Sequence, residues 1–193
     1  RNWCSSVLKN KARSAVIWSG FDTLTRQMLS FITMIILARL LAPSDFGTIA
    51  LLGIFIGIGN LFVDVGLSSA LIQKQDVTHL DESTVFWFNA VAALFVSLIL
   101  FGCSRYIAGY FGLPVLESLT KWLSLNVFVG ALGTVQRTLL TKVLNFKKLM
   151  NVSLSANVLA GAVAIYMAWA GFGVMALMGQ VLVRTFIETA LLW

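Results

Sequence analysis

The chain has 193 residues, of which 59% are hydrophobic and only 11% are charged. A soluble domain has about a quarter of its residues charged, so a single water-exposed globule is excluded. The formal net charge of +6 would suggest nucleic acid in a soluble protein. Here the basic residues lie mainly between apolar runs, so we interpret them as topology signals and expect no nucleic-acid partner.

Six apolar segments follow one another along the chain and predict an all-α membrane protein, a bundle of about six transmembrane helices. At about 1.5 Å per residue each segment is long enough to cross the hydrocarbon, some with tilt. We expect a single domain over residues 1–193. The segments cover roughly residues 15–41, 46–72, 84–110, 116–136, 150–170 and 173–193.

The connections between these segments carry turn and helix-start signals. Residues 42–45 (APSD) predict the start of a helix, because proline suits the first turn and an acidic group favours that end of the dipole. Residues 73–84 are polar and predict a loop that contains the single histidine, His79. Gly112 and Pro114 separate the third segment from the fourth, and residues 171–173 (GFG) form a tight link between the last two.

The distribution of basic residues between alternate loops predicts the orientation of the chain. Nine lie on one side and three on the other, which places the start of the chain in the cytoplasm. Six spans return its end to the same side. The nine are Arg1, Lys9, Lys11, Arg13, Lys74, Arg137, Lys142, Lys147 and Lys148, and the three are Arg39, Arg105 and Lys121.

Charged residues within the expected spans are the candidates for a functional role, because a charge at the bilayer centre costs several kcal/mol. Asp22 and Arg26 are four residues apart in the first span and share a helix face. Arg184 and Glu188 repeat this spacing in reverse order in the sixth span, and Asp64 lies in the second. Interior faces and wet cavities are where such residues usually point.

Two arginines, Arg26 and Arg184, fall near the middle of their helices, about 16 Å along each. Arginine offers a planar fork of donors to phosphate, so one interpretation is that both bind an anionic head group such as a pyrophosphate. The other is that Asp22–Arg26 and Arg184–Glu188 are salt bridges that only neutralise each other. Asp64 likewise is either a carboxylate that couples transport to a cation gradient or a helix-packing partner.

No constellation for catalysis, metal or cofactor binding is visible in the sequence. It has no nucleophile with an adjacent base, no phosphate-binding glycine loop and no cluster of metal ligands. Cys4 and Cys103 are far apart in sequence and have no metal-binding spacing. We therefore expect a protein that is not an enzyme. We interpret the basic stretch from Arg137 to Lys148 as a loop that contacts anionic lipid.

Several strings, taken in order, resemble the helix junctions of Wzx-type polysaccharide and O-antigen exporters. The first is LARLLAPSDFG at residues 37–47, followed by DVGLSSALIQ at 64–73 and FWFN at 86–89. Gln136-Arg137, Phe146-Lys147 and GFGV at residues 171–174 continue the series. The likeness is greatest to the branch that includes the colanic-acid and teichuronic-acid exporters.

This resemblance implies a member of the multidrug/oligosaccharidyl-lipid/polysaccharide exporter superfamily, in which two bundles of six helices face a central cavity and work by alternating access. The implied substrate is an undecaprenyl-pyrophosphate-linked sugar unit, moved across a bacterial inner membrane. Lipid-linked oligosaccharide and membrane lipids are the implied partners. The length of the chain matches one bundle, so we expect it to be the N-terminal lobe and to need a C-terminal lobe or a second chain for transport.

Two other functions are compatible with the sequence. A cation-coupled drug antiporter of the same superfamily would need an acidic cavity, which the two mid-span arginines disfavour. A membrane assembly subunit that does not transport would be expected if a chain of this length were complete.

Overall fold

The computed structural model describes residue 20 and residues 23–63, 79–142 and 146–193. These residues form six α-helices and no strand. The first runs from Thr23 to Leu40, and the labelled helices are α2 (Pro43–Val63), α4 (His79–Phe111), α5 (Val115–Lys142), α6 (Phe146–Trp169) and α7 (Val174–Leu192). The expected all-α fold is therefore confirmed.

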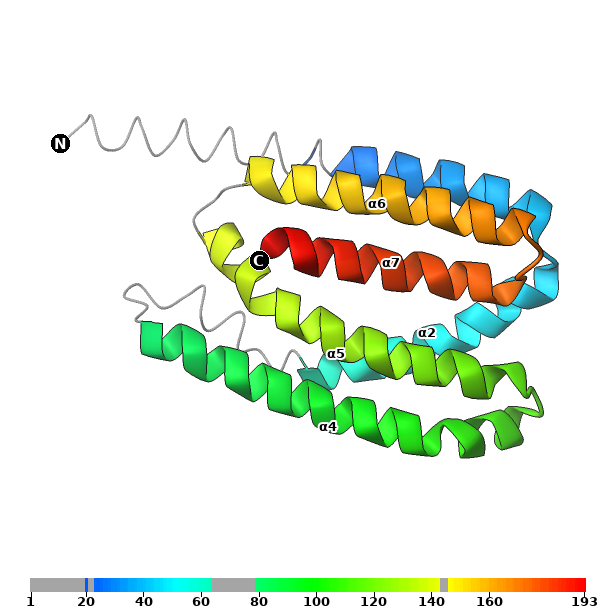
Figure 1. Ribbon diagram of the computed structural model, residues 1–193, viewed down its shortest axis with the longest axis horizontal. Coiled ribbons are helices and arrows are strands. Elements are labelled where there is room, and N and C mark those ends of the chain that lie inside the picture. The colour runs from blue at the N-terminus through cyan, green and yellow to red at the C-terminus, as the bar shows by residue number, and fades with distance from the viewer. Residues whose placement is uncertain (1–19, 21–22, 64–78, 143–145) are drawn as a thin grey trace.

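The helices run up and down along the long axis of the molecule (Figure 1). Helix α4 packs on α5, α5 on α7 and α7 on α6, and α2 crosses behind this row and contacts α4, α5 and α7. The helix from residue 23 to residue 40 lies beside α6, and its Leu37, together with Leu41 directly after the helix, packs on Ala164 and Ala168. The bundle thus has α4 at one edge, and α6 with the helix from residue 23 to residue 40 at the other.

The interior of the bundle is lined by small and aliphatic side chains, whereas large apolar side chains remain on the outside. One buried cluster joins Leu52 of α2 to Leu119 and Leu123 of α5 and to Met178 of α7. Phe95 on the outer face of α4 is 66% exposed. Among the described residues five helices are long and apolar enough to cross a membrane. An apolar exterior around a small-residue interior is the pattern that lipid requires.

The start of α2 follows the prediction from its sequence. The helix begins at Pro43, and the backbone N–H of Ala42 donates a hydrogen bond of 3.2 Å to Oδ2 of Asp45. This contact satisfies one of the backbone donors left open at a helix start. At the far end of α4, Gly112 adopts a φ of +65°, and the N–H of Leu113 donates to the carbonyl of Ala108 over 3.2 Å. Glycine accepts this left-handed conformation at little cost, so α4 ends here.

Two helix ends differ from the sequence-based expectation. Helix α4 begins at His79, which the sequence predicts to lie in a loop, and α5 continues through Arg137 to Lys142. Hydropathy indicates which residues lie in the hydrocarbon of the bilayer, whereas a helix ends where its backbone hydrogen bonds end. At about 1.5 Å per residue the 33-residue α4 is about 50 Å long, well beyond a hydrocarbon layer of about 30 Å. Arg137 is therefore a helical residue, and its assignment to a basic loop was wrong.

Candidate functional site

The candidate site lies on the contact between α5 and α7, which approach closely because α5 carries glycine there. A methyl group at Gly133 would lie only 2.9 Å from Oγ1 of Thr189 and 3.5 Å from its Cα. The Thr189 hydroxyl donates a hydrogen bond of 3.2 Å across the contact to the carbonyl of Val129. Small residues that let backbones approach, together with hydrogen bonds between helices, are how membrane helices associate without a hydrophobic driving force.

One turn beyond Gly133, Arg137 projects onto the same contact and meets the charged pair of α7. Arg184 donates from Nε to Oε1 of Glu188 over 3.1 Å, and Nη1 of Arg137 lies 3.4 Å from the other oxygen, Oε2. We call Arg137, Arg184 and Glu188 the seam cluster. Two positive charges on one carboxylate leave a net charge of +1.

The carboxylate of the seam cluster is far less exposed than its arginines. The Glu188 side chain is 16% exposed, whereas Arg137 and Arg184 are 43% and 41% exposed. Arg184 is the eleventh residue of the 19-residue α7, which places it about 15 Å along a helix of about 29 Å. A charge near the middle of a span is expensive unless it is paired, so Glu188 balances the arginines electrostatically.

A small cavity lies behind the carboxylate, between α5, α6 and α7. It has a volume of about 10 Å³ and is lined by Arg137, Glu188 and the buried Ser153, with three aliphatic side chains. This volume corresponds to about one water molecule. A sugar or phosphate group does not fit there, so any larger anion must approach the arginines from their exposed side.

Arg26, the other arginine singled out in the sequence, lies on the helix from residue 23 to residue 40 and is partly exposed. This helix meets α7 at its far end, where Leu37 packs near Leu177. Measured from that contact, Arg26 lies about 16 Å away along its own helix, and Arg184 lies about 10 Å away along α7. The depths of the two arginines in the bundle therefore differ by roughly one helical turn.

Two of the carboxylates that the sequence suggested, Asp22 and Asp64, lie outside the described residues. Arg184 and Glu188 are in contact, as their spacing of four residues predicts. Sequence reasoning missed Arg137 because it was counted as a loop charge. The signal that could have found it is its spacing of four residues from Gly133, because this spacing places Arg137 on the same helix face as a glycine that allows a close helix contact. Within the described ranges no group of three metal-ligating side chains occurs.

Comparison with known proteins identifies the family. Residues 36–193 match the family described as "Polysaccharide biosynthesis protein", which is most of the chain. The chain belongs to the polysaccharide biosynthesis protein family. Together with its long apolar helices, this membership makes it a multi-pass membrane protein of polysaccharide biosynthesis.

Proteins of several bacteria resemble the chain. It is 30% identical over 171 residues to the succinoglycan biosynthesis transport protein ExoT of Rhizobium meliloti (strain 1021), covering 89% of this chain and 35% of ExoT. The lipopolysaccharide biosynthesis protein WzxC of Escherichia coli (strain K12) is 31% identical over 154 residues, which are 80% of this chain and 31% of WzxC.

A third relative is the teichuronic acid biosynthesis protein TuaB of Bacillus subtilis (strain 168), 23% identical over 177 residues, with 92% of this chain and 36% of TuaB covered. The chain thus spans about a third of the length of these relatives. WzxC and TuaB confirm the resemblance to Wzx-type exporters seen in the helix junctions. No solved structure matches the chain.

Proposed function

We propose that the chain is one lobe of a transporter that exports undecaprenyl-pyrophosphate-linked polysaccharide repeat units by alternating access. The observation that carries this proposal is the family match over residues 36–193. Its relatives are named for the biosynthesis of three different polymers, succinoglycan, lipopolysaccharide and teichuronic acid. A bundle of apolar helices that bears paired charges at mid-span is suited to moving a polar group past lipid.

Within this function, Arg26 and Arg184 bind the anionic pyrophosphate of the substrate. The contact of Arg184 with Glu188 uses Nε, so among the described residues the two terminal amino groups of its guanidinium are available to an anion. Its side chain is 41% exposed, which supports access from one side. Arginine keeps its charge at mid-span and matches phosphate geometry with paired donors.

The carboxylates have complementary roles in the proposal. Glu188 holds Arg184 in position, and Asp22 and Asp64 act as coupling or salt-bridging groups. A cation antiporter would be expected to have an acidic cavity, whereas the seam cluster has two arginines around one carboxylate. This charge balance supports export of an anion over the antiporter.

A second lobe, on the same chain or on another, completes the transporter in this proposal. Two observations support it: the chain spans about a third of its relatives, and the helix from Thr23 to Leu40 has only 6% of its residues buried. Met28 and Phe31 of that helix are 68% and 65% exposed. We place the protein in a bacterial inner membrane, with the start of the chain in the cytoplasm as its basic loops predict.

Complementation tests this function in a strain that lacks its polysaccharide exporter, with the complete gene product expressed. We expect the wild type to restore polymer at the cell surface. Arg184→Gln and Arg26→Gln should each reduce polymer about tenfold, the effect of losing one charge-assisted contact. Arg39→Gln, which removes an exposed charge at the end of the helix from Thr23 to Leu40, is the matched control and should export normally.

Immunoblots of the membrane fraction separate loss of function from loss of protein. Normal export by both arginine variants at normal protein level would rule out their binding role and leave the export function standing. Failure of the wild type to complement, combined with proton-driven efflux of cationic dyes, would identify the antiporter. Failure without efflux would favour the assembly subunit.

A further inference from the structure

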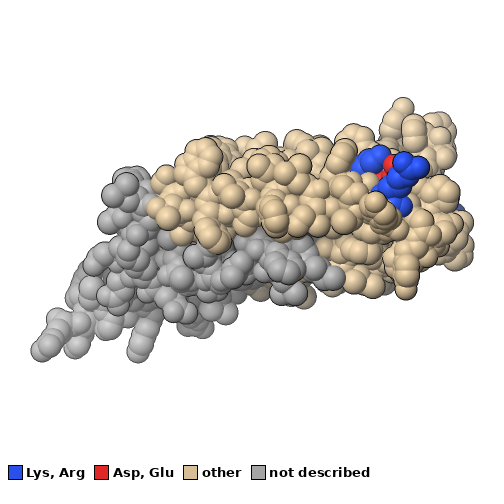
Figure 2. All heavy atoms as spheres, turned by 90° about the horizontal axis from the view of Figure 1, so that it is seen from below, with Lys and Arg blue, Asp and Glu red and all other residues tan. Residues whose placement is uncertain are grey.

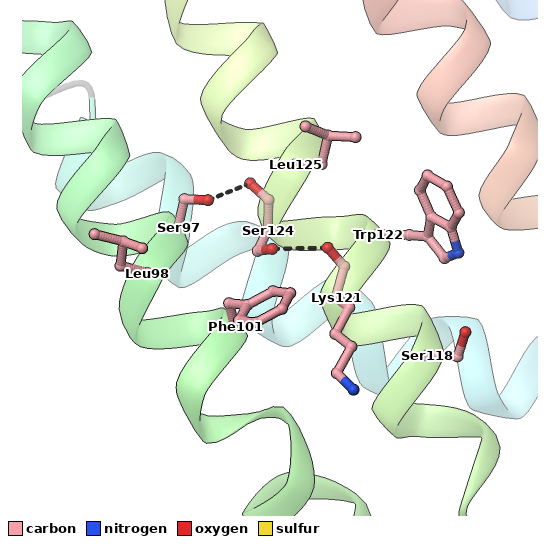
Figure 3. Close-up of a pocket in the computed structure, with 8 residues that line it drawn as sticks. All are labelled: Ser97, Leu98, Phe101, Ser118, Lys121, Trp122, Ser124 and Leu125. Atoms are coloured by element: carbon pink, nitrogen blue, oxygen red, sulfur yellow. Dashed lines mark hydrogen bonds between the residues drawn. The ribbon is translucent and has the colours of Figure 1, made fainter.

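A second site lies at the other end of α5, on the outer face that it forms with α4. A groove of about 600 Å³ opens between the two helices and is lined by Leu98 and Phe101 of α4 and by Trp122 and Leu125 of α5 (Figure 3). Leu98 is 61% exposed and Phe101 54%, so the groove opens to the surroundings of the bundle. Its volume is far larger than that of the cavity at the seam cluster.

Charged groups gather at one end of this groove. Seen from the side on which α4 lies, the described surface is uncharged except for basic and acidic atoms near one end (Figure 2). Lys121 Nζ lies 2.7 Å from Oε1 of Glu117, and Arg105 is near enough to interact electrostatically with the same carboxylate. We call Arg105, Glu117 and Lys121 the hairpin cluster. Two positive charges and one negative charge leave a net charge of +1.

The groove changes from polar to apolar along its length. The Lys121 ammonium lies at one end, at the level of Ser118, while Leu125 and Ser97 lie at the other (Figure 3). The serine hydroxyls at the deeper end are satisfied internally, since Ser97 donates to the carbonyl of Ser124 over 2.8 Å and Ser124 donates to that of Lys121 over 2.7 Å. The deeper end of the groove therefore presents few free hydrogen-bond donors, and it is lined mainly by apolar side chains.

The depth of Lys121 matches the boundary between lipid head groups and hydrocarbon. Helix α5 has 28 residues, so it is about 42 Å long and, when centred, extends about 6 Å beyond a 30 Å hydrocarbon layer at each end. Lys121 is six residues after Val115, which puts its Cα about 9 Å along the helix and about 3 Å inside that layer. A lysine at this depth extends its ammonium to the phosphate level while its stem stays in hydrocarbon.

We infer that the groove between α4 and α5 is a binding site for an anionic phospholipid of the surrounding bilayer. The phosphate binds Lys121 and Arg105, and one acyl chain lies along Phe101, Leu98 and Leu125. Three observations on the same groove support this occupant: the net positive charge, the polar-to-apolar gradient and the depth. Glu117 competes with the phosphate for the ammonium of Lys121, so it limits the affinity of the site.

Lipid retention measured by native mass spectrometry tests this inference. The complete gene product is released from nanodiscs that contain equal amounts of phosphatidylglycerol and phosphatidylcholine. We expect the wild type to retain phosphatidylglycerol preferentially, and Lys121→Gln to lower that preference about fivefold, the effect of one basic side chain at a membrane surface. Glu117→Gln should change the preference in the opposite direction and raise it, because it removes the competing carboxylate.

Two matched controls separate the groove from general surface effects. Arg39→Gln removes an exposed cation at the end of the helix from Thr23 to Leu40 and should leave the preference unchanged. Leu98→Trp fills the groove and should reduce the number of lipids retained, whereas Leu159→Trp, at a 51% exposed position on α6, should not. Lys121→Arg retains the charge and should behave as the wild type, which shows that the fold tolerates substitution there.

Several outcomes would overturn the inference. Equal losses in Lys121→Gln and Arg39→Gln would show a diffuse surface effect, and a lowered preference in Glu117→Gln would show a merely structural cluster. Unchanged retention in Leu98→Trp would place the acyl chain elsewhere. Recovery of a polyprenyl pyrophosphate in place of a diacyl lipid would assign the groove to the substrate, and a second copy of the chain there, detected as a dimer, would assign it to self-association.

Discussion

The hairpin cluster and the seam cluster have the same charge composition, two cations around one carboxylate, but they are stabilised differently. In the hairpin cluster Lys121 and Glu117 are one helical turn apart on α5, and their side chains are 42% and 39% exposed. In the seam cluster Glu188 is 16% exposed and is contacted from α5 as well as from its own helix. The first pair is stabilised locally and remains accessible, whereas the second depends on the packing of two helices.

This difference predicts which cluster the fold needs. An exposed ion pair contributes little to stability, because solvent already screens its charges. Glu188 is only 16% exposed and is shared by two arginines, so it is costly to remove, because the arginines then lose their counter-charge. We therefore expect the seam cluster to contribute more to the stability of the fold than the hairpin cluster, in addition to the substrate contact proposed for Arg184.

The largest expected effect is that of Glu188→Gln. It leaves Arg184 near the middle of its span, and Arg137 closer to the end of α5, without their shared counter-charge, so we expect a loss of about 2–3 kcal/mol, less than for a fully buried pair because the arginines are 41% and 43% exposed. Thermal unfolding in detergent, followed by the monodisperse fraction in size-exclusion chromatography, measures this change. A melting temperature equal to that of the wild type would contradict the assignment.

A neutral seam provides the control for this prediction. Replacing Arg137, Arg184 and Glu188 together by Gln removes all three charges, so no arginine is left unpaired. Most of the stability that is lost in Glu188→Gln should therefore be restored. No recovery would indicate that Glu188→Gln acts through packing and not through charge.

An intermediate effect is expected at Gly133, which sets the approach of α5 to α7. In Gly133→Ala the new methyl group would lie 2.9 Å from Thr189 Oγ1, so the hydroxyl that bonds the Val129 carbonyl, or the helix that carries it, must shift. We expect a loss of about 1–2 kcal/mol, typical of overpacking. The matched control is Gly109→Ala on α4, where nothing lies within 4 Å of the added carbon.

The control should change stability in the opposite direction. Alanine is favoured over glycine in a helix by about 1 kcal/mol, so Gly109→Ala should raise the melting temperature slightly. If both variants lower the melting temperature equally, the loss reflects glycine flexibility in general, and the close approach at Gly133 has no special importance.

The smallest expected effect on stability is that of Glu117→Gln. Because the Lys121–Glu117 pair is exposed and local, its loss should leave the melting temperature of the protein unchanged within the error of the measurement. The same thermal assay measures it beside Glu188→Gln. A decrease as large as that of Glu188→Gln would remove the distinction between the two clusters.

The sequence by itself determined the features that depend on neighbouring residues. Runs of apolar residues predicted a helical membrane bundle, residues 42–45 predicted the start of α2, and the spacing of Arg184 and Glu188 predicted their contact. Each of these follows from backbone chemistry or from helix periodicity over a few residues. The helix junctions also carried enough local pattern to indicate the family.

Only the tertiary structure decided which distant residues meet. Arg137 and Glu188 are 51 residues apart, and hydropathy assigned Arg137 to a loop because it measures solvent preference and not backbone hydrogen bonding. The packing of Gly133 against Thr189 brings the arginine onto the carboxylate of another helix. The groove beside Lys121 is likewise formed by two helices. Contacts of this kind depend on how side-chain volumes fit across helices, which no periodicity along one helix records.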